Sequence, residues 1–349
     1  MTTILQLIPS LAPNDAIGTH TRRLDALLKE FGFETAIYAD EYDASLASIA
    51  EPFARLRRHP PRGAWYLYQA STNSRISDWL RDRPRVMLNY HNVTPHELTK
   101  PWEPSIARVL WQARREIGNL ARTTQYAFTV SRYNANDLLK LGFLHPLVAP
   151  PLIEVPTITQ STPSAHTNWL FVGRIFPNKH QLFLLEAFAH YRSLFDPGAT
   201  LTLVGSTASR RYLGAIESAI HSYGLDSAVR LLSGLSSVEL AREYAHATLF
   251  TSASLHEGYG FPFVEAFAAR LPVLALETSA VAETVGDAGW LIADHNPLTF
   301  ATAAQLLRHD PVLRTKLIDR GQVRLGVFDP TMQRERYRTI FATIVGSRR

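Results

Sequence analysis

The residues best placed for chemistry in this sequence are two carboxylates, Glu257 and Glu265, which stand eight positions apart around a Gly-rich turn. Gly258 and Gly260 remove side chains where the backbone must turn tightly or approach a ligand. Pro262 fits the first position of a helix, where its missing N–H costs nothing. The free N–H groups of that first helical turn favour anions such as phosphate. Acids beside such a helix end suit a ligand that is both anionic and rich in hydroxyl groups, such as a nucleotide sugar.

Two cations lie in an earlier segment that reads V-G-R-I-F-P-N-K. Arg174 follows an apolar strand and Lys179 precedes a helix. Together they could hold one diphosphate, the Arg through a bidentate fork and the Lys as a point charge. Surface Arg and Lys residues more often solvate a loop, but the downstream acidic pair makes a binding role the stronger interpretation.

Apolar strands and amphipathic helices alternate along the whole chain, which indicates parallel, doubly wound sheets. In the first half the expected strands are Ile4–Pro9, Glu34–Ala39, Trp65–Gln69, Val86–Tyr90 and Tyr126–Val130, and a helix opens at Gly18. Val155–Thr167 is rich in Pro, Ser and Thr and is expected to be a linker. The alternation then restarts with strands at Trp169–Val172, Leu201–Val204, Val229–Leu232 and Leu249–Thr251, and helices at Gln181–Leu194, Leu213–Tyr223 and Val238–Ala247. Because such sheets bind ligands at the carboxyl ends of their strands, the active cleft is expected between the two lobes.

The spacing Glu, seven residues, Glu, with G-F-P-x-x-E-A between, resembles the retaining glycosyltransferases of family 4, which have the two-lobed GT-B fold. The resemblance implies that Glu257 lies by the donor sugar and that Glu265 holds the ribose hydroxyls. The family's second lobe opens with a similar G-R-x-x-x-x-K-G segment, so Arg174 and Lys179 are expected to neutralise the leaving diphosphate. His180 stands where the family usually has Gly.

The same resemblance extends the expected site to both lobes. It brings Gly18 near the donor phosphate and gives His91, at a strand end, contact with the donor sugar and the incoming acceptor. A lone His is more often structural, and the chain has 13. The expected catalytic residues are His91, Glu257, Arg174 and Lys179. The expected donor-binding residues are Gly18, Arg174, Lys179, Ser233, Gly234, Leu235, Glu257, Gly258, Gly260, Phe261, Pro262 and Glu265. Ser131, as a helix N-cap, and Glu283, at a helix end, are expected to be structural.

The resemblance also assigns the lobes. Residues 1–155 are expected to form the acceptor-binding lobe and residues 156–330 the lobe that binds the nucleotide-sugar donor. The C-terminal helix, within residues 331–349, is expected to pack back on the first lobe.

Composition indicates a soluble globular protein with ample core. The 349 residues exceed one usual core, and 46% of them are hydrophobic, with 19% charged. The absence of cysteine excludes disulfides and thiolate chemistry. We see no signal peptide and no run approaching the ~20 apolar residues of a spanning helix, so a cytoplasmic location is expected.

The net charge of +5 is unevenly distributed. Residues 55–132 contain fourteen Lys and Arg but five acids. This excess could hold the inner face of an anionic membrane or a pyrophosphate-bearing lipid, or it could be a well-solvated basic surface. Nucleic acid is not expected, since no familiar nucleic-acid module is found.

The expected reaction moves a hexose from a nucleotide sugar to a saccharide or lipid-linked saccharide, as in bacterial polysaccharide or glycolipid assembly. The resemblance implies retention at the anomeric carbon, and we expect front-face transfer without metal or cofactor, because no D-x-D metal motif is evident. GDP-mannose is preferred over a UDP-hexose because Y-H-N-x-T-P resembles bacterial members of this kind. The alternatives are a sugar-nucleotide epimerase, a phosphorylase and a non-catalytic sugar-binding protein.

Overall fold

The computed structural model describes residues 2–13, 15–152, 155–159 and 165–346. Asn14 of the expected first loop and residues 160–164 of the expected linker, Pro163 included, therefore lie outside the described residues. The chain divides into two compact units. Unit 1 comprises Met1–His96, Ser105–Ile153 and Asp329–Arg349, and unit 2 comprises Glu97–Pro104 and Glu154–Phe328.

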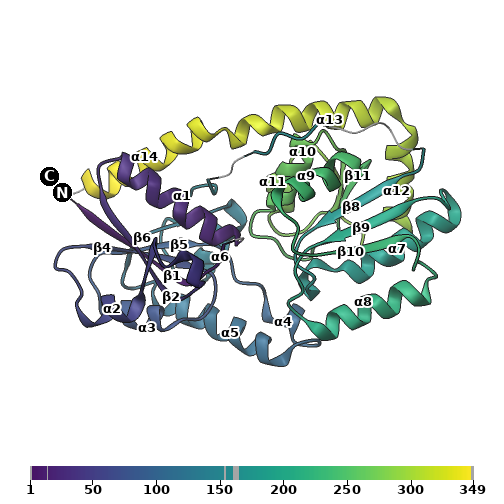
Figure 1. Ribbon diagram of the computed structural model, residues 1–349. Helices are drawn as coiled ribbons and strands as arrows, with labels where there is room; N and C mark the ends of the chain where they lie inside the picture. Colours follow the sequence, from purple (N-terminus) through teal and green to yellow (C-terminus); the bar gives the residue numbers. More distant parts are fainter. Residues whose placement is uncertain (1, 14, 153–154, 160–164, 347–349) are drawn as a thin grey trace. The chain divides into compact units, whose positions relative to one another are not determined.

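Unit 1 is built on a parallel sheet in the order β3-β2-β1-β4-β5-β6-β7 (Figure 1). Its strands are β1 (Thr3–Leu11), β2 (Glu34–Tyr42), β3 (Ala50–Pro52), β4 (Trp65–Ala70), β5 (Val86–Tyr90), β6 (Thr124–Thr129) and β7 (Leu147–Val148). Since β2 and β3 lie on one side of β1 and β4 to β7 on the other, the direction of winding reverses between β1 and β4. This reversal is the topological switch point, where sheets of this kind leave room for a ligand.

Helices cover both faces of the first sheet. They are α1 (Ala16–Glu30), α2 (Phe53–Arg58), α3 (Arg75–Leu80), α5 (Pro104–Asn119), α6 (Arg132–Lys140) and α14 (Pro330–Gly346). The short helix α4 (His96–Thr99) lies, except for His96, in a segment that belongs to unit 2. One core joins α2, α3, α5 and α6 to the face that carries Leu5 and Leu88, and the other joins α1 and α14 to the face that carries Ile4 and Met87. The end of the chain therefore packs beside its first helix, with Phe341 against Phe33 (6.1 Å between ring centroids).

Unit 2 repeats the design with a second parallel sheet, in the order β10-β9-β8-β11-β12-β13. Its strands are β8 (Asn168–Val172), β9 (Thr200–Val204), β10 (Val229–Leu232), β11 (Leu249–Ser252), β12 (Val273–Leu276) and β13 (Trp290–Ile292). Its helices are α7 (Gln181–Leu194), α8 (Arg210–Ser222), α9 (Ser237–His246), α10 (Phe261–Ala268), α11 (Val281–Val285), α12 (Pro297–His309) and α13 (Pro311–Leu325). The winding reverses between β8 and β11, so this pair of strands marks the second switch point.

A short segment from the first half of the sequence belongs to unit 2. The Trp102 ring meets Tyr212 edge-on, 4.9 Å between centroids, and Ser209, the N-cap of α8, donates a hydrogen bond to Glu103 (2.6 Å). Nothing in the sequence pattern pointed to this excursion of Glu97–Pro104.

Most expected elements are present, and their boundaries shift where a capping residue decides them. The first helix begins at Ala16, two residues before the predicted Gly18, because the Asp15 carboxylate accepts the Gly18 N–H (2.8 Å) and caps the helix. Ser131 caps α6 as predicted, accepting from the Asn134 N–H. Among the helices of the described residues, none is both long enough and apolar enough to cross a membrane.

Candidate functional site

The candidate site in unit 2 forms where the loops after β8 and β11 leave the sheet at the switch point. Arg174 and Lys179 lie on the first loop, and Glu257 lies on the second. On the other side of β8, the loop after β9 approaches the start of the same loop, because a Cβ added at Gly205 would lie 2.0 Å from the Gly173 carbonyl oxygen. Loops that turn apart at a switch point leave a crevice at the carboxyl edge of such a sheet.

Lys179 and Glu257 form an ion pair. The Lys179 Nζ lies 2.6 Å from Glu257 Oε1, and each side chain is only 14% exposed. The two sequence segments that predicted cation and acid therefore meet in the fold. Without a ligand each charge is neutralised by the other, so an incoming diphosphate and Glu257 would share or compete for the same ammonium group.

Three polar residues hold this pair in place. Asn178 is buried, donates to the His256 carbonyl (3.0 Å) and accepts the Leu255 N–H on its own carbonyl (2.8 Å), which joins the two loops. Gln181 donates to the Arg174 carbonyl (2.8 Å), and the Ser279 hydroxyl accepts the Glu257 N–H (2.7 Å). Sequence reasoning missed all three. Asn178 and Gln181 flank Lys179 in the chain and could have been suspected, whereas Ser279 gave no signal.

His180 takes the position where the related family usually has Gly. Its backbone is left-handed (φ 55°, ψ 38°), a conformation that costs a residue with a Cβ about 1–2 kcal/mol and that Gly adopts freely. The His180 ring stacks on Phe183, with 5.3 Å between centroids. Burial, and then the charge of His295, lower the pKa of His180, so the ring is neutral at physiological pH. The loop thus keeps a turn suited to Gly while carrying a His.

The turn before α10 requires glycine at position 260, because of both its backbone conformation and the space around it. Gly260 has φ 97° and ψ 60°, and an added Cβ would lie 2.6 Å from the Phe263 ring. Gly260 is the N-cap of α10, so Phe261 is the first helical residue and Pro262, predicted at that position, is the second. Proline is tolerated there equally, since the N–H of either position has no partner inside the helix.

Glu265 has a partner that the sequence did not suggest. The Tyr244 hydroxyl donates to Glu265 Oε2 (2.7 Å) and also approaches the Pro262 carbonyl (3.3 Å). Burial raises the pKa of the Glu265 carboxyl, and the hydrogen bond from Tyr244 opposes that rise. Burial and the Glu265 charge raise the pKa of Tyr244 well above its ordinary value, so the phenol remains a neutral donor. A Glu265 carboxylate held by Tyr244 in this way is suited to accept hydrogen bonds from the hydroxyl groups of a ligand.

The remaining unit 2 candidates lie apart from these contacts. Arg174 is exposed, its guanidinium lies 5.8 Å from the centre of the Phe176 ring, and it makes no ion pair within the described residues. Ser233, Gly234 and Leu235 form the loop after β10, the edge strand, and Gly234 is left-handed (φ 69°). Arg174 is therefore available to a ligand anion, while the loop at residues 233–235 presents mainly backbone groups.

The unit 1 candidates lie in a different chemical setting. The Gly18 N–H is occupied by the Asp15 carboxylate, and a Cβ there would lie 3.1 Å from Leu11. His91 follows β5, and its Nε2 lies 2.7 Å from Gln69 Oε1. Burial, with the nearby His20, lowers the pKa of His91 well below its usual range, so this imidazole is neutral. His20 meets it edge-on, with 5.3 Å between ring centroids.

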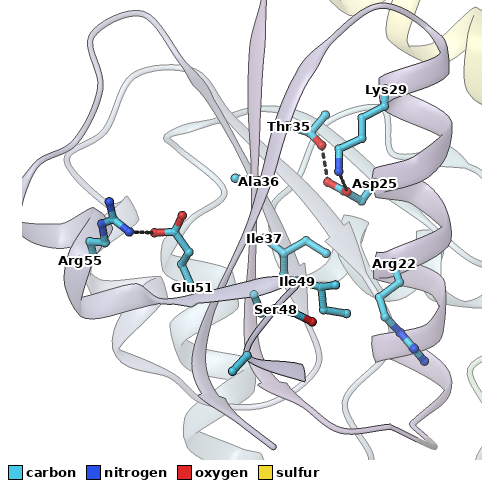
Figure 2. Close-up of a pocket in the computed structure, with 12 residues that line it drawn as sticks. Arg22, Asp25, Lys29, Thr35, Ala36, Ile37, Ser48, Ile49, Glu51 and Arg55 are labelled. Carbon is cyan, nitrogen blue, oxygen red and sulfur yellow. Dashed lines mark hydrogen bonds and ion pairs between the residues drawn. The ribbon is translucent and has the colours of Figure 1, made fainter. Parts of the chain in front are cut away.

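The basic region of unit 1 is partly neutralised by its own contacts. Arg75 pairs with Asp40, Arg81 with Asp78, Arg114 with Asp137, and Arg83 lies over the Trp79 ring. A pocket of about 600 Å³ lies between α1 and the strands β2 and β3 (Figure 2). Its charged groups also pair internally, Lys29 with Asp25 (2.7 Å) and Arg55 with Glu51 (2.8 Å). Arg22 also lines the pocket and hydrogen-bonds neutral oxygens of Pro13 and Thr19, so the pocket keeps one cation that these two ion pairs do not balance.

No group of three or more His, Asp or Glu side chains among the described residues is arranged to hold a metal ion.

Comparison with known proteins gives the site a family context. Residues 161–324 match the family model for glycosyl transferases, group 1. An MMP alpha-(1->4)-mannosyltransferase of Mycolicibacterium hassiacum is 31% identical over 208 residues, which cover 56% of this chain and 49% of the relative. A D-inositol 3-phosphate glycosyltransferase of Jonesia denitrificans is 30% identical over 153 residues, covering 42% of this chain and 36% of the relative. The chain thus spans between about a third and a half of the length of these two curated relatives.

Solved structures match over nearly the whole chain. The structure of Anabaena Alr3699/HepE in complex with UDP and glucose gives a TM-score of 0.79 at 16% identity and covers 98% of this chain and all of that one. WaaG, a glycosyltransferase involved in lipopolysaccharide biosynthesis, gives 0.74 at 16% identity and covers 97% and 99%. These likenesses confirm the predicted fold class, two Rossmann-like α/β domains of the GT-B type, and the sequence of unit 2 matches group 1 glycosyl transferases.

Proposed function

We propose that this protein is a retaining glycosyltransferase that moves a hexose, preferably mannose, from a nucleotide sugar to a saccharide or lipid-linked saccharide acceptor. The observation that carries the proposal is the Lys179–Glu257 ion pair at the switch point of unit 2, inside the segment that matches group 1 glycosyl transferases. A cation and an acid held together at the end of a parallel sheet suit a ligand that is a phosphate at one end and a polyol at the other.

The residues divide the work of transfer between them. Lys179 and Arg174 stabilise the negative charge that grows on the departing diphosphate, as preorganised cations do in a partly dry site. Glu265, held by Tyr244, accepts hydrogen bonds from the ribose hydroxyls, and Glu257 lies by the donor sugar. The bond from the anomeric carbon to the diphosphate oxygen breaks while the acceptor oxygen bonds to the same face. The acceptor's proton passes to the departing phosphate.

Donor and acceptor follow from the relatives by analogy. A mannosyl transfer is named for the Mycolicibacterium relative and for an Escherichia coli O-antigen chain mannosyltransferase B that is 36% identical over 80 residues. The HepE structure is described as a complex with UDP and glucose, so a UDP-hexose is our second choice of donor. We propose GDP-mannose first, no metal or cofactor, and a cytoplasmic enzyme of polysaccharide or glycolipid assembly. The unpaired part of the basic region would contact the inner membrane face.

The first test is a thermal-shift screen of the purified protein with UDP, GDP, ADP, dTDP and their sugars. A ligand that binds only the folded state at 100 times its Kd adds about 2.7 kcal/mol to the unfolding free energy, enough to raise Tm by several degrees. We expect one nucleotide family to shift Tm, and Arg174→Ala and Glu265→Ala to abolish the shift. Arg210→Ala and Glu186→Ala, at exposed positions on unit 2 helices, are the matched controls.

A turnover assay with the selected donor separates the alternatives. A transferase consumes the donor only with an acceptor, and the product keeps the donor's anomeric configuration, which proton NMR of the new linkage reports. An epimerase would convert the donor alone, and a non-catalytic sugar-binding protein would bind without turnover. No Tm shift with any nucleotide would contradict the proposal.

A further inference from the structure

Unit 1 contains a row of buried amides that the proposed reaction does not use directly. Gln6 of β1, Gln69 of β4 and Asn89 of β5 are all fully buried, and they lie on three adjacent strands. Gln69 and Asn89 are register partners. Since a buried amide is destabilising unless it is hydrogen-bonded, such a row is retained only if its bonds are made. The row crosses the β1–β4 switch point and ends beside His91, which follows β5.

A backbone carbonyl fixes the direction of the hydrogen bonds along the row. The Thr21 carbonyl can only accept, so the Gln6 group 3.1 Å away is its NH2 and the other end of Gln6 is its oxygen. That oxygen accepts from Gln69 Nε2 at 2.7 Å. Gln69 therefore presents its own oxygen at the far end of its side chain, and this oxygen is the atom that faces His91. The orientation of an amide, ordinarily ambiguous, is here set by its neighbours.

The His91 ring must match that oxygen. Its Nε2 lies 2.7 Å from Gln69 Oε1, an acceptor, so Nε2 carries the proton and donates. A neutral imidazole has one N–H, which leaves Nδ1 as an acceptor. Nδ1 makes no hydrogen bond to any other described residue. It is the one ring atom of His91 that could accept a hydrogen bond from a ligand hydroxyl group.

The contacts of His20, which form a second branch of the row, require the opposite direction of hydrogen bonding at Asn89. The Leu152 N–H donates to His20 Nδ1 (3.2 Å), so neutral His20 carries its proton on Nε2, which faces Asn89 Nδ2 at 3.1 Å. Two donors therefore meet at Asn89, whose own oxygen is buried and has no hydrogen-bond partner. The Gln69–Gln6 and Gln69–His91 contacts, each 2.7 Å, are shorter than either contact of His20 (3.1 and 3.2 Å), so the mismatch falls on the His20 branch.

We propose that Gln69, oriented by Gln6, is the positioning residue that holds His91 as its Nε2–H tautomer and so leaves Nδ1 to accept a hydrogen bond from a substrate hydroxyl. The role in substrate binding rests on the proposed function together with the family resemblance, which implies that His91 contacts the donor sugar and the acceptor. The tautomer itself does not rest on it, because every contact that sets it lies within unit 1.

The test is NMR of the histidine ring nitrogens in protein labelled with 15N-histidine, without any ligand. His91 signals are assigned by their loss in His91→Gln. We expect one tautomer in the wild type, with the proton on Nε2, and a mixture of both tautomers in Gln69→Leu and Gln6→Leu. Asn89→Leu removes the contact with His20 and one donor to Gln69 Oε1 (2.9 Å) but leaves the Gln6–Gln69 and Gln69–His91 hydrogen bonds, so His91 should keep its proton on Nε2. Loss of one hydrogen bond of ordinary strength should lower kcat/KM of Gln69→Leu by about tenfold, with donor-induced Tm shifts retained.

A proton on Nδ1 of His91 in the wild type would overturn the proposal, as would a folded Gln69→Leu or Gln6→Leu variant with the wild-type tautomer. The wild-type measurement stands even if these variants do not fold. If the tautomer is as expected but no transfer is found with any donor, the proposed function fails while the positioning role of Gln69 stands. If transfer is found and the tautomer is the other one, only the positioning role fails.

Discussion

The two units treat polar side chains near their switch points in opposite ways. In unit 2 the groups are charged and keep some exposure, as the Lys179–Glu257 pair does at 14% for each side chain. In unit 1 the groups are neutral amides and imidazoles, and Gln6, Gln69 and Asn89 have no exposed surface. The same strand topology thus carries a charged site in one unit and an uncharged hydrogen-bonded row in the other.

The difference follows from desolvation. Moving a charge fully out of water costs several kcal/mol, which an ion pair recovers only with good geometry, whereas a buried amide needs only its hydrogen bonds. The phosphate binding that we propose for Lys179 requires the charges of this site to stay near water. The row of amides, which only orients the His91 ring, can be buried completely. Substitutions in unit 2 should therefore affect ligand binding more than folding, and substitutions in the unit 1 row should do the reverse.

The largest effect is expected for Lys179→Ala. Loss of one preorganised group that stabilises transition-state charge typically lowers kcat by about 10²–10³-fold. The unfolding free energy should fall by only about 1 kcal/mol, because Glu257 keeps partial contact with water. Steady-state transfer kinetics and urea unfolding measure the two quantities. Lys316→Ala, at an exposed position on α13, is the control and should change neither. A Lys179→Ala enzyme with wild-type kcat would mean that the charged site of unit 2 does not serve transfer, and the contrast between the two units would no longer hold.

The next effect is expected for Gln6→Leu, and it should appear in stability. The change leaves Gln69 Nε2 and the Thr21 carbonyl without their partner inside the protein, which should lower the unfolding free energy by about 2 kcal/mol. Gln125→Leu makes the same substitution at an exposed position of β6 and should change stability by less than about 0.5 kcal/mol. Urea denaturation of both variants measures these changes in the unfolding free energy. Equal stabilities would mean that the row is not a structural necessity.

The charged site was largely predictable because its residues lie in short contiguous motifs. Arg174 and Lys179 share one loop, Glu257 and Glu265 flank one turn, and parallel topology brings the two segments to one sheet edge. The fold class was predictable for a related reason, since buried parallel strands read as apolar runs separated by amphipathic helices. The roles assigned to these residues stay predictions until a ligand is measured.

The uncharged row was not predictable, although each member left a trace in the sequence. Gln6, Gln69 and Asn89 interrupt the apolar strands L-Q-L, Y-Q-A and L-N-Y, and a lone polar residue in a buried strand is unusual. Only the strand order and register reveal that the three side chains meet. Tyr244 and Ser279 were missed for the same reason, because each contacts a predicted residue that lies about twenty positions away.

The smallest effect is expected for Glu265→Gln, and it should have the opposite sign. Burial raises the pKa of this carboxyl in the folded protein, so the folded state binds the proton more tightly than the unfolded state does. The unfolding free energy therefore falls as pH rises from the unfolded pKa, near 4.5, through the folded pKa, and the full penalty is present above the folded pKa. Glu265→Gln removes the penalty and should stabilise the protein at pH 7 by a few tenths to about 1 kcal/mol.

The gain should shrink as pH falls and vanish near pH 3, well below the unfolded pKa of about 4.5, where Glu265 is protonated in both states. Urea unfolding at the two pH values measures it, and Glu186→Gln, at an exposed position on α7, should show no such difference. The same variant should lose nucleotide-induced Tm shifts if Glu265 accepts the ribose hydroxyls. A gain in stability joined to a loss of binding is the pattern of a side chain kept for function, whereas Gln6→Leu should lose stability and keep binding. If Glu265→Gln instead destabilises the protein at pH 7, then the carboxylate is structural and the two units differ less than their charges suggest.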